Sequence, residues 1–133
     1  MSDALGDAIA ALGAVLEPMT GLVRWFDDPP EAISEFPAGM AFAVSGEITA
    51  VTSGFNRGLH KIRIAIYLSR TVLPTAVDAA KVWPYRIHTA LVADQTLSGK
   101  VQAIVWPLSY RCGPMFYGGE THFGVAADVT VKI

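Results

Sequence analysis

The simplest hydrophobic pattern in the chain lies at its C-terminal end. From Phe123 to Ile133 apolar and polar positions alternate. One face would carry Val125, Ala127, Val129, Val131 and Ile133, and the other Ala126, Asp128, Thr130 and Lys132. A period of two is expected of a strand that turns one face to the core and the other to water. The pattern predicts a half-buried strand over residues 123–133.

A second alternating segment predicts a strand from Leu59 to Ser69. Its apolar face would carry Ile62, Ile64, Ile66 and Leu68, and its polar face Lys61, Arg63, Tyr67 and Ser69. The polar face is suited to water or to a polar interface. Upstream lies another extended segment, Ile48–Ser53, and the linker Gly54-Phe55-Asn56-Arg57-Gly58 has two glycines around an asparagine. This arrangement predicts a β-hairpin.

Two further strands are predicted from short apolar segments. Alternation over Met40–Val44 predicts a strand that opens after Pro37 and ends at Gly46. Between Lys100 and Trp106 both alternating sets are largely apolar, which is typical of a strand inside the sheet. We therefore expect residues 100–106 to form a central strand. The chain would reverse at Gly99 and at Gly118-Gly119, because glycine reaches positive φ without steric cost.

Helical spacing occurs near the N-terminus and in the middle of the chain. Leu5, Ile9, Leu12 and Leu16 predict a helix from about Asp3 that ends before Pro18. Alanine-rich segments that begin at Pro74 and Pro84 predict two short helices or one kinked helix, with Val82, Ile87 and Leu91 toward the sheet.

Between the first helix and the Met40 strand, the sequence predicts a short extended segment and one turn of helix. The extended segment is Leu22–Phe26. Asp28 and Glu31 have capping-box spacing, which predicts a single helical turn over Glu31–Glu35.

Together these elements predict one α+β domain over residues 1–133. Its sheet would be mixed and mainly antiparallel, with an N-terminal helix and a second helical segment packed on one face.

Composition changes this picture in one respect. Apolar residues make up 52% of the chain and charged residues 17%, against about 25% charged in typical soluble domains. No apolar run approaches the roughly 18 residues that cross a bilayer, so we expect apolar surface to be hidden between copies of the chain or against partners. A monomer with a rich core is the competing interpretation. Met1-Ser2-Asp3 lacks the features of a secretory signal, which predicts a cytosolic protein.

Candidate chemical groups are sparse. The net charge is −2 without a basic run, which argues against tight nucleic-acid binding. His60, His88 and His122 are scattered without metal-ligand spacing, and Cys112 is the sole cysteine. Gly118-Gly119 is followed by neither a Lys-Ser/Thr pair nor a helix start, so it is not a phosphate loop. The sequence predicts no enzyme, no cofactor and no metal site.

Two turn motifs resemble those of a known family. Asp94-Gln95-Thr96-Leu97-Ser98-Gly99-Lys100-Val101 follows the helical segment, and Tyr117-Gly118-Gly119 precedes the closing strand. In these motifs, in size and in its helix-first layout, the chain resembles the tail-terminator (tail-completion) proteins of long-tailed bacteriophages. The likeness covers most of the chain, more firmly from Pro74 to Ile133. Ser98 stands where the family has glycine, and Trp83-Pro84 interrupts a usually more continuous helix.

The resemblance implies a virion protein that assembles in the host cytoplasm as a homo-oligomeric ring of six copies. This ring would sit on the head-proximal end of the tail tube, stop tube polymerisation and contact the neck or head-completion protein. DNA would pass through its lumen as a non-specific passenger. No membrane and no cofactor would be involved.

Contacts between copies are expected at two turns of the chain. An exposed strand edge or the hairpin of one copy would extend the sheet of the next. Phe55 would be either an anchor in the partner or a side chain folded back on its own hairpin. The residues expected at these contacts are Phe55, Asn56 and Arg57 in the hairpin and Tyr117, Gly118 and Gly119 in the second turn.

Two other classes of protein share features with this sequence. A head-completion or other minor virion structural protein has the same compositional profile. A small α+β enzyme or ligand-binding domain would instead gather histidines, Asp94 or Cys112 in a deep pocket.

Overall fold

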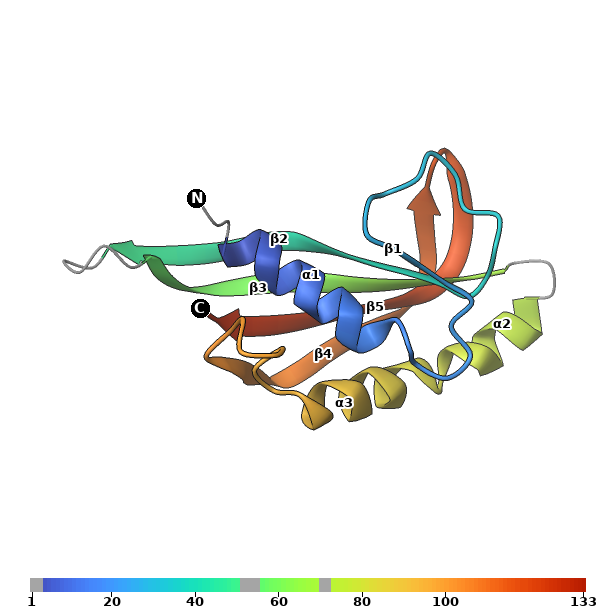
Figure 1. Ribbon diagram of the computed structural model, residues 1–133. Coiled ribbons are helices and arrows are strands. Elements are labelled where there is room, and N and C mark those ends of the chain that lie inside the picture. The colour runs from blue at the N-terminus through green and yellow to red at the C-terminus, as the bar shows by residue number, and fades with distance from the viewer. Residues whose placement is uncertain (1–3, 51–55, 70–72) are drawn as a thin grey trace.

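The computed structural model describes residues 4–50, 56–69 and 73–133. Three helices and five strands follow one another along these residues (Figure 1). In chain order they are α1 (Ala4–Leu16), β1 (Arg24–Phe26), β2 (Ala38–Ala50), β3 (Asn56–Leu68), α2 (Leu73–Ala80), α3 (Trp83–Ala93), β4 (Ala103–Tyr117) and β5 (Glu120–Lys132). The protein is an α+β fold with a mixed sheet, as its alternating and helical segments predict.

The five strands form one sheet in the order β1-β2-β3-β5-β4. Every neighbouring pair is antiparallel except β1 and β2, which run parallel over three residue pairs. The β2–β3 hairpin reaches away from the helices at one end, and the β4–β5 hairpin curls up at the opposite end (Figure 1). The two turns predicted from the sequence therefore lie far apart in the molecule.

All three helices pack on one face of the sheet, and the main core lies between them. In α1, Ala8, Leu12 and Leu16 recur every four residues and are buried against the sheet. Pro84 lies in the first turn of α3, where its missing N–H leaves no helical hydrogen bond unmade. The sheet contributes the alternating apolar sets predicted from β3 and β5, Ile62, Ile64, Ile66, Leu68, Val125, Ala127, Val129 and Val131.

The opposite face of the sheet has a smaller core at one end. Residues 27–37, the β1–β2 loop, cross this end and bury Ile33 and Phe36 against it. Below the loop lie Ala38, Met40, Ala65, Tyr67, Met115 and Tyr117, which all face this side of the sheet by the strand register. Tyr67, predicted on a polar face, is therefore almost fully buried.

Residues 100–106 do not form a central strand. They lead into β4, which is an edge strand of the sheet. The two apolar faces of residues 100–106 have different surroundings. Ile104 enters the main core and Trp106 packs beside His88 of α3, whereas Val105 is exposed. Pro107, which lacks a backbone N–H, fits an edge strand.

Three smaller expectations are also wrong. No helical turn follows Asp28, because the β1–β2 loop is shaped by the burial of Ile33 rather than by helix propensity. Val82 is 40% exposed, since the chain bends between α2 and α3 and Trp83 takes the buried position. Gly46 does not end β2, which keeps its pairing with β3 as far as Ala50.

Candidate functional site

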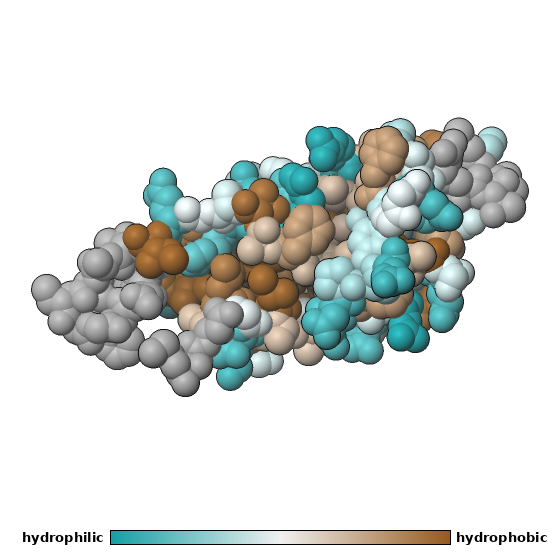
Figure 2. Space-filling view, turned by 90° about the horizontal axis from the view of Figure 1, so that it is seen from above, coloured by the Kyte–Doolittle hydropathy of each residue, from teal (hydrophilic) through white to brown (hydrophobic). Residues whose placement is uncertain are grey.

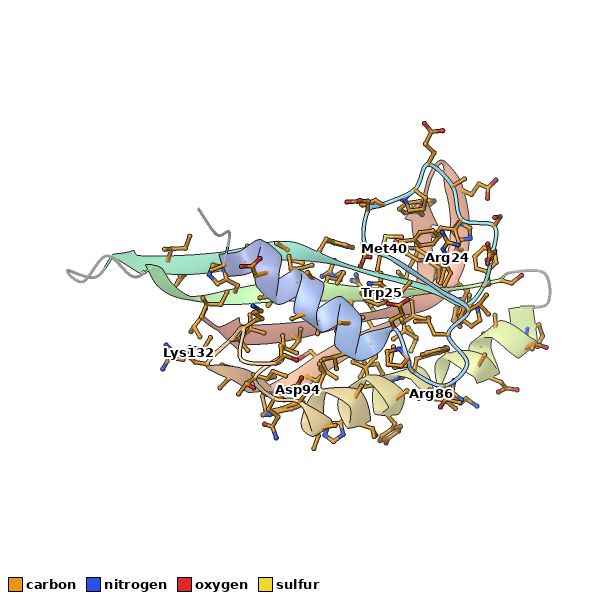
Figure 3. All side chains as sticks on the ribbon, viewed as in Figure 1. Arg24, Trp25, Met40, Arg86, Asp94 and Lys132 are labelled. Atoms are coloured by element: carbon orange, nitrogen blue, oxygen red, sulfur yellow. The ribbon has the colours of Figure 1, made fainter. Side chains whose placement is uncertain are left out.

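The sheet face opposite the helices is bare beyond the β1–β2 loop. We call this part, made by residues 59–63 of β3, 126–132 of β5 and the facing residues of β4 and β2, the open face. Strand register places its charged side chains together: Lys61, Arg63, Arg111 and Lys132, with Asp128 and Glu47. The four cations come from three strands, with Lys61 and Lys132 71 positions apart in the sequence. They outnumber the two carboxylates by two to one. Lys132 lies in the half of the molecule away from Arg24 and Met40 (Figure 3).

One ion pair organises the middle of the open face. Arg63 donates to both carboxylate oxygens of Asp128, through Nε at 2.8 Å and Nη2 at 3.2 Å. The hydrogen bond from Arg63 holds the pKa of Asp128 below its ordinary value, and the positive charges of Lys61 and Arg111 lower this pKa further. The same contact raises the pKa of Arg63. Lys61 and Arg111 themselves form no ion pair within the described residues, so their charges are free to meet a partner.

The β1–β2 loop beside the open face has the opposite charge. Asp27, Asp28, Glu31 and Glu35 lie in it and all are exposed, while the segment contains no Lys or Arg. None of these carboxylates forms a salt bridge in the described parts of the chain. The loop is thus an acidic ridge next to a basic surface.

The β4–β5 turn holds this acidic loop in place. The Tyr117 hydroxyl donates to the carbonyl oxygen of Pro30, and the Tyr117 ring packs edge-on to Tyr67 with centroids 5.5 Å apart. Gly118 has φ of +58° and lies so close to the Glu31 carbonyl oxygen that a Cβ would overlap it. The acidic loop is fixed through its backbone, while its carboxylates project into solvent.

A third feature is the free edge of β2. Its pairing with β1 stops at Met40, and no described strand pairs with its outer side from Ala41 to Ala50. Each residue from Phe42 to Ile48 is exposed, and Ile48 is exposed to 68%. In the view from above, strongly hydrophobic residues are most frequent in the half of the molecule next to the β2–β3 hairpin, and hydrophilic residues occur in both halves (Figure 2). This edge presents both backbone groups and apolar side chains.

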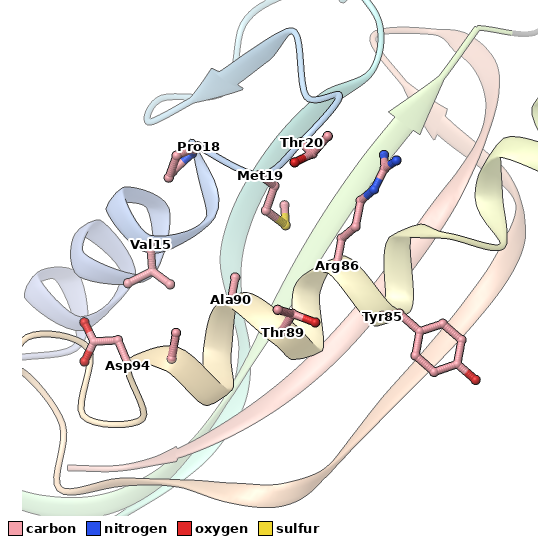
Figure 4. Close-up of a pocket in the computed structure, with 10 residues that line it drawn as sticks. Val15, Pro18, Met19, Thr20, Tyr85, Arg86, Thr89, Ala90 and Asp94 are labelled. Atoms are coloured by element: carbon pink, nitrogen blue, oxygen red, sulfur yellow. The ribbon is translucent and has the colours of Figure 1, made fainter.

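A cavity of about 520 Å³ lies between the end of α1 and α3 (Figure 4). Val15, Met19 and Ala90 are among its lining residues, with Arg86 at one end and Asp94 at the other. Both charged groups have structural contacts. The Arg86 guanidinium lies 4.9 Å from the centre of the Trp83 ring, and the Asp94 carboxylate accepts the Ser98 N–H at 3.0 Å and the Ser98 hydroxyl at 3.2 Å.

A second cavity of about 500 Å³ is an aromatic groove between α3 and β4. Tyr85, Trp106 and Tyr110 line it, and His88 packs against Trp106 with ring centroids 5.4 Å apart. The Trp106 indole N–H donates to Gln95 Oε1 at 3.2 Å. The groove is mainly apolar and suits packing better than acid–base chemistry.

The histidines and the cysteine are not brought together. His60 faces the helix side of the sheet next to Gly46, His88 is on α3, and His122 is buried under the β1–β2 loop beside Phe36. Cys112 is exposed on β4, where it pairs with Val125, and it lies on the face of the sheet opposite His122. Across the described part of the chain, no group of three or more His, Cys, Asp or Glu could hold a metal ion.

The residues expected at contacts between copies lie at opposite ends of the molecule. Asn56 and Arg57 begin β3 at the far end of the hairpin, and Phe55 lies outside the described residues. Tyr117 and Gly118 make the internal contacts with the β1–β2 loop, whereas Gly119 is exposed with open space around its Cα. Sequence reasoning missed the open face, because its cations belong to separate strands. The signal was present in the polar alternation of residues 61–63 and 128–132, but it needed the strand order.

Comparisons with models of protein families and with curated proteins give no match to the chain. Within residues 4–50, 56–69 and 73–133, no helix is both long and apolar enough to span a membrane.

Proposed function

We propose that this protein is a virion structural protein, a tail terminator that forms a ring on the head-proximal end of a phage tail tube. In this role the ring stops tube polymerisation and joins the tube to the neck or head-completion protein. The proposal combines the resemblance in the Asp94–Val101 and Tyr117–Gly119 motifs with one structural observation, the free edge of β2.

The free edge supports an assembly role because monomeric proteins usually protect such edges. Short edge strands, prolines, lysines and covering loops are the common protections. Residues 41–50 of β2 contain no proline and no lysine, and their exposed side chains include Phe42, Val44 and Ile48. A bulge between Ala43 and Ser45, which is itself a common edge protection, interrupts the register once, and regular pairing with β3 continues from Ser45 to Ala50.

The other edge of the sheet is protected in the usual way. β4 contains Pro107 and Pro114 and has an irregular register between Val105 and Ser109. The edge of β2 is thus less protected than the edge of β4, so each copy has one sheet-extending surface. A ring requires this edge to meet a different surface of the next copy, which is a heterologous contact, because pairing of two β2 edges with each other would be isologous and would close as a dimer.

Electron microscopy with and without tail tubes tests the proposed function. We expect closed rings on one end of purified tubes, and tubes that stop growing when the protein is added to tube subunits. Binding to the head side alone would assign the protein to head completion instead. A protein that neither forms rings nor alters tube length would refute the proposal.

A proline pair tests the part played by the free edge. Backbone N–H groups of consecutive residues point to opposite sides of a strand. Of the two variants Glu47→Pro and Ile48→Pro, one therefore removes an N–H that points at β3, and the other removes an N–H on the free edge. The variant that keeps its unfolding temperature should lose assembly. Ile48→Thr keeps the N–H and serves as the control. Normal assembly by the stable proline variant would exclude sheet extension at this edge.

A further inference from the structure

The charges of this chain are separated into two complementary surfaces on one side of the sheet. The β1–β2 loop carries Asp27, Asp28, Glu31 and Glu35 without a cation, and the open face carries Lys61, Arg63, Arg111 and Lys132 around Asp128. Four of the 12 acidic and four of the 10 basic residues are thus placed in two adjacent regions.

Most charged side chains of both regions have no ion-pair partner in the described part of the chain. Among the described residues, Arg63 is the only cation of the open face in a salt bridge, which it forms with Asp128, and none of the loop carboxylates is in one. A small hollow of about 140 Å³ lies between Arg63, Arg111 and Asp128. Its position beside two guanidinium groups suits a carboxylate side chain, because guanidinium groups bind carboxylates with paired N–H donors.

The two regions cannot satisfy each other within one molecule. The loop is fixed to the covered end of the sheet by Tyr117 and Gly118, and its ordered contacts are with that end. Its carboxylates remain exposed rather than turning to the cations of the same sheet. A second copy of the chain can present its loop to the open face without disturbing either element.

We propose that the open face is the docking site for a second copy of this chain, whose acidic β1–β2 loop packs on Lys61, Arg63 and Arg111. The inference rests on the proposed function in that it names a contact between copies in the ring. Apolar side chains at the border of the site, Phe42, Leu59 and Val105, would be covered at the same time. Charge complementarity would set which surfaces meet and speed their encounter.

A basic surface could also bind a nucleic acid. The structure favours a second copy because this chain itself supplies a fixed ridge of opposite charge, and because the cations are interleaved with exposed apolar side chains and with Asp128. Binding of duplex DNA to the wild type and to the face variant is therefore measured alongside self-association, which distinguishes a nucleic acid from a second copy as the occupant.

Charge reversal in two variants tests the contact. The face variant is Lys61→Glu with Arg111→Glu, and the loop variant is Asp27→Lys with Asp28→Lys. All four side chains are exposed, so the folded state should survive, as checked by circular dichroism and unfolding temperature. The matched control, Lys81→Glu with Lys100→Glu, makes the same change of charge as the face variant at exposed positions outside the open face.

Self-association is measured by sedimentation at low and at high salt. Each variant alone should associate at least ten-fold more weakly than wild type, and an equimolar mixture of the two should recover to within about three-fold, since each reversed surface then meets its complement. The control should associate as wild type does. Recovery in the mixture is the decisive result, because a merely misfolded variant cannot be rescued by another one.

Three results would overturn the inference. These are wild-type association by both single variants, no recovery in the mixture of two folded variants, and a wild-type chain that stays monomeric at low salt and millimolar concentration.

Loss of duplex DNA binding by the face variant, with association unchanged, would assign the surface to nucleic acid. If rescue is observed but no ring caps a tube, the contact stands and the proposed function fails. If both variants still cap tubes, the function stands and this contact fails.

Discussion

Two adjacent glycines in the β4–β5 turn offer a test of how the acidic loop is held. Gly118 has φ of +58° and Gly119 has φ of +79°, so alanine at either position pays the cost of a left-handed backbone, about 1–2 kcal/mol. Only Gly118 faces another part of the protein. A Cβ there would overlap the Glu31 carbonyl oxygen, whereas nothing lies within 4 Å of a Cβ on Gly119.

The expected destabilisation therefore differs between the two variants. Overpacking against a backbone atom costs about 1–3 kcal/mol more, so Gly118→Ala should lose about 2–5 kcal/mol and Gly119→Ala about 1–2 kcal/mol. If the loop moves away instead, the hydrogen bond from Tyr117 to Pro30 is lost, which costs about 1 kcal/mol. In a domain of this size each kcal/mol lowers the unfolding temperature by roughly 3–5 °C.

Urea unfolding gives the free energies, and a glutamate-specific protease reports on the loop. Cleavage after Glu31 and Glu35 should be faster in Gly118→Ala than in Gly119→Ala under native conditions, because only the first substitution displaces the loop. Equal destabilisation by the two substitutions, or equal cleavage rates in the loop, would refute the idea that the Gly118 turn holds it.

Further substitutions test the remaining contacts. Asp94→Ala should cost about 1–2 kcal/mol in urea unfolding, since the Ser98 N–H loses its acceptor; an unchanged midpoint would contradict this. Ser98→Gly should stabilise the protein by up to about 1 kcal/mol, because Ser98 has φ of +58°; a lower midpoint in urea unfolding would contradict this. Asp128→Asn should cost about 1 kcal/mol at pH 7. Because the pKa of Asp128 is depressed from 3.8, its contribution is present above that value and fades as the pH falls through the lower folded pKa; a difference from wild type that persists in strong acid would point to packing instead. Leu12→Ala should cost about 2–5 kcal/mol, since this side chain is fully buried in the main core.

The strands and helices with regular spacing could be predicted from the sequence. Alternation in β3 and β5 identifies their core faces, because each strand turns a single face to the helices. Helical spacing in α1 identifies Ala8, Leu12 and Leu16 for the same reason. These elements are defined by local periodicity, and the structure confirms them.

Features that depend on the order of strands could not be predicted in this way. The apolar faces of residues 100–106 are typical of a central strand, but here one face packs on α3 and the other is exposed at an edge. The β1–β2 loop buries Ile33 in a second core, and the sequence around Ile33 has no regular hydrophobic spacing that predicts this burial. Ser98, noted as a departure from the glycine of the resembled family, adopts the positive φ that glycine favours, which gives this departure a physical meaning.

Strand order also explains how a chain with few charges can use them for recognition. Acidic residues are concentrated in the β1–β2 loop and cations on the open face, and the free edge of β2 has Glu47 as its one charged residue between Phe42 and Ile48. Two surfaces are then available to a neighbouring copy, and they differ in the interactions that they offer. Sheet extension along the free edge depends on backbone hydrogen bonds and apolar burial, which salt hardly screens, whereas the contact of loop and open face weakens as the Debye length shortens. If both contacts join the copies, rising salt should weaken self-association only in part, and urea should remove the part that salt leaves. Loss of all self-association under one of these two conditions alone would mean that only one of the surfaces joins the copies.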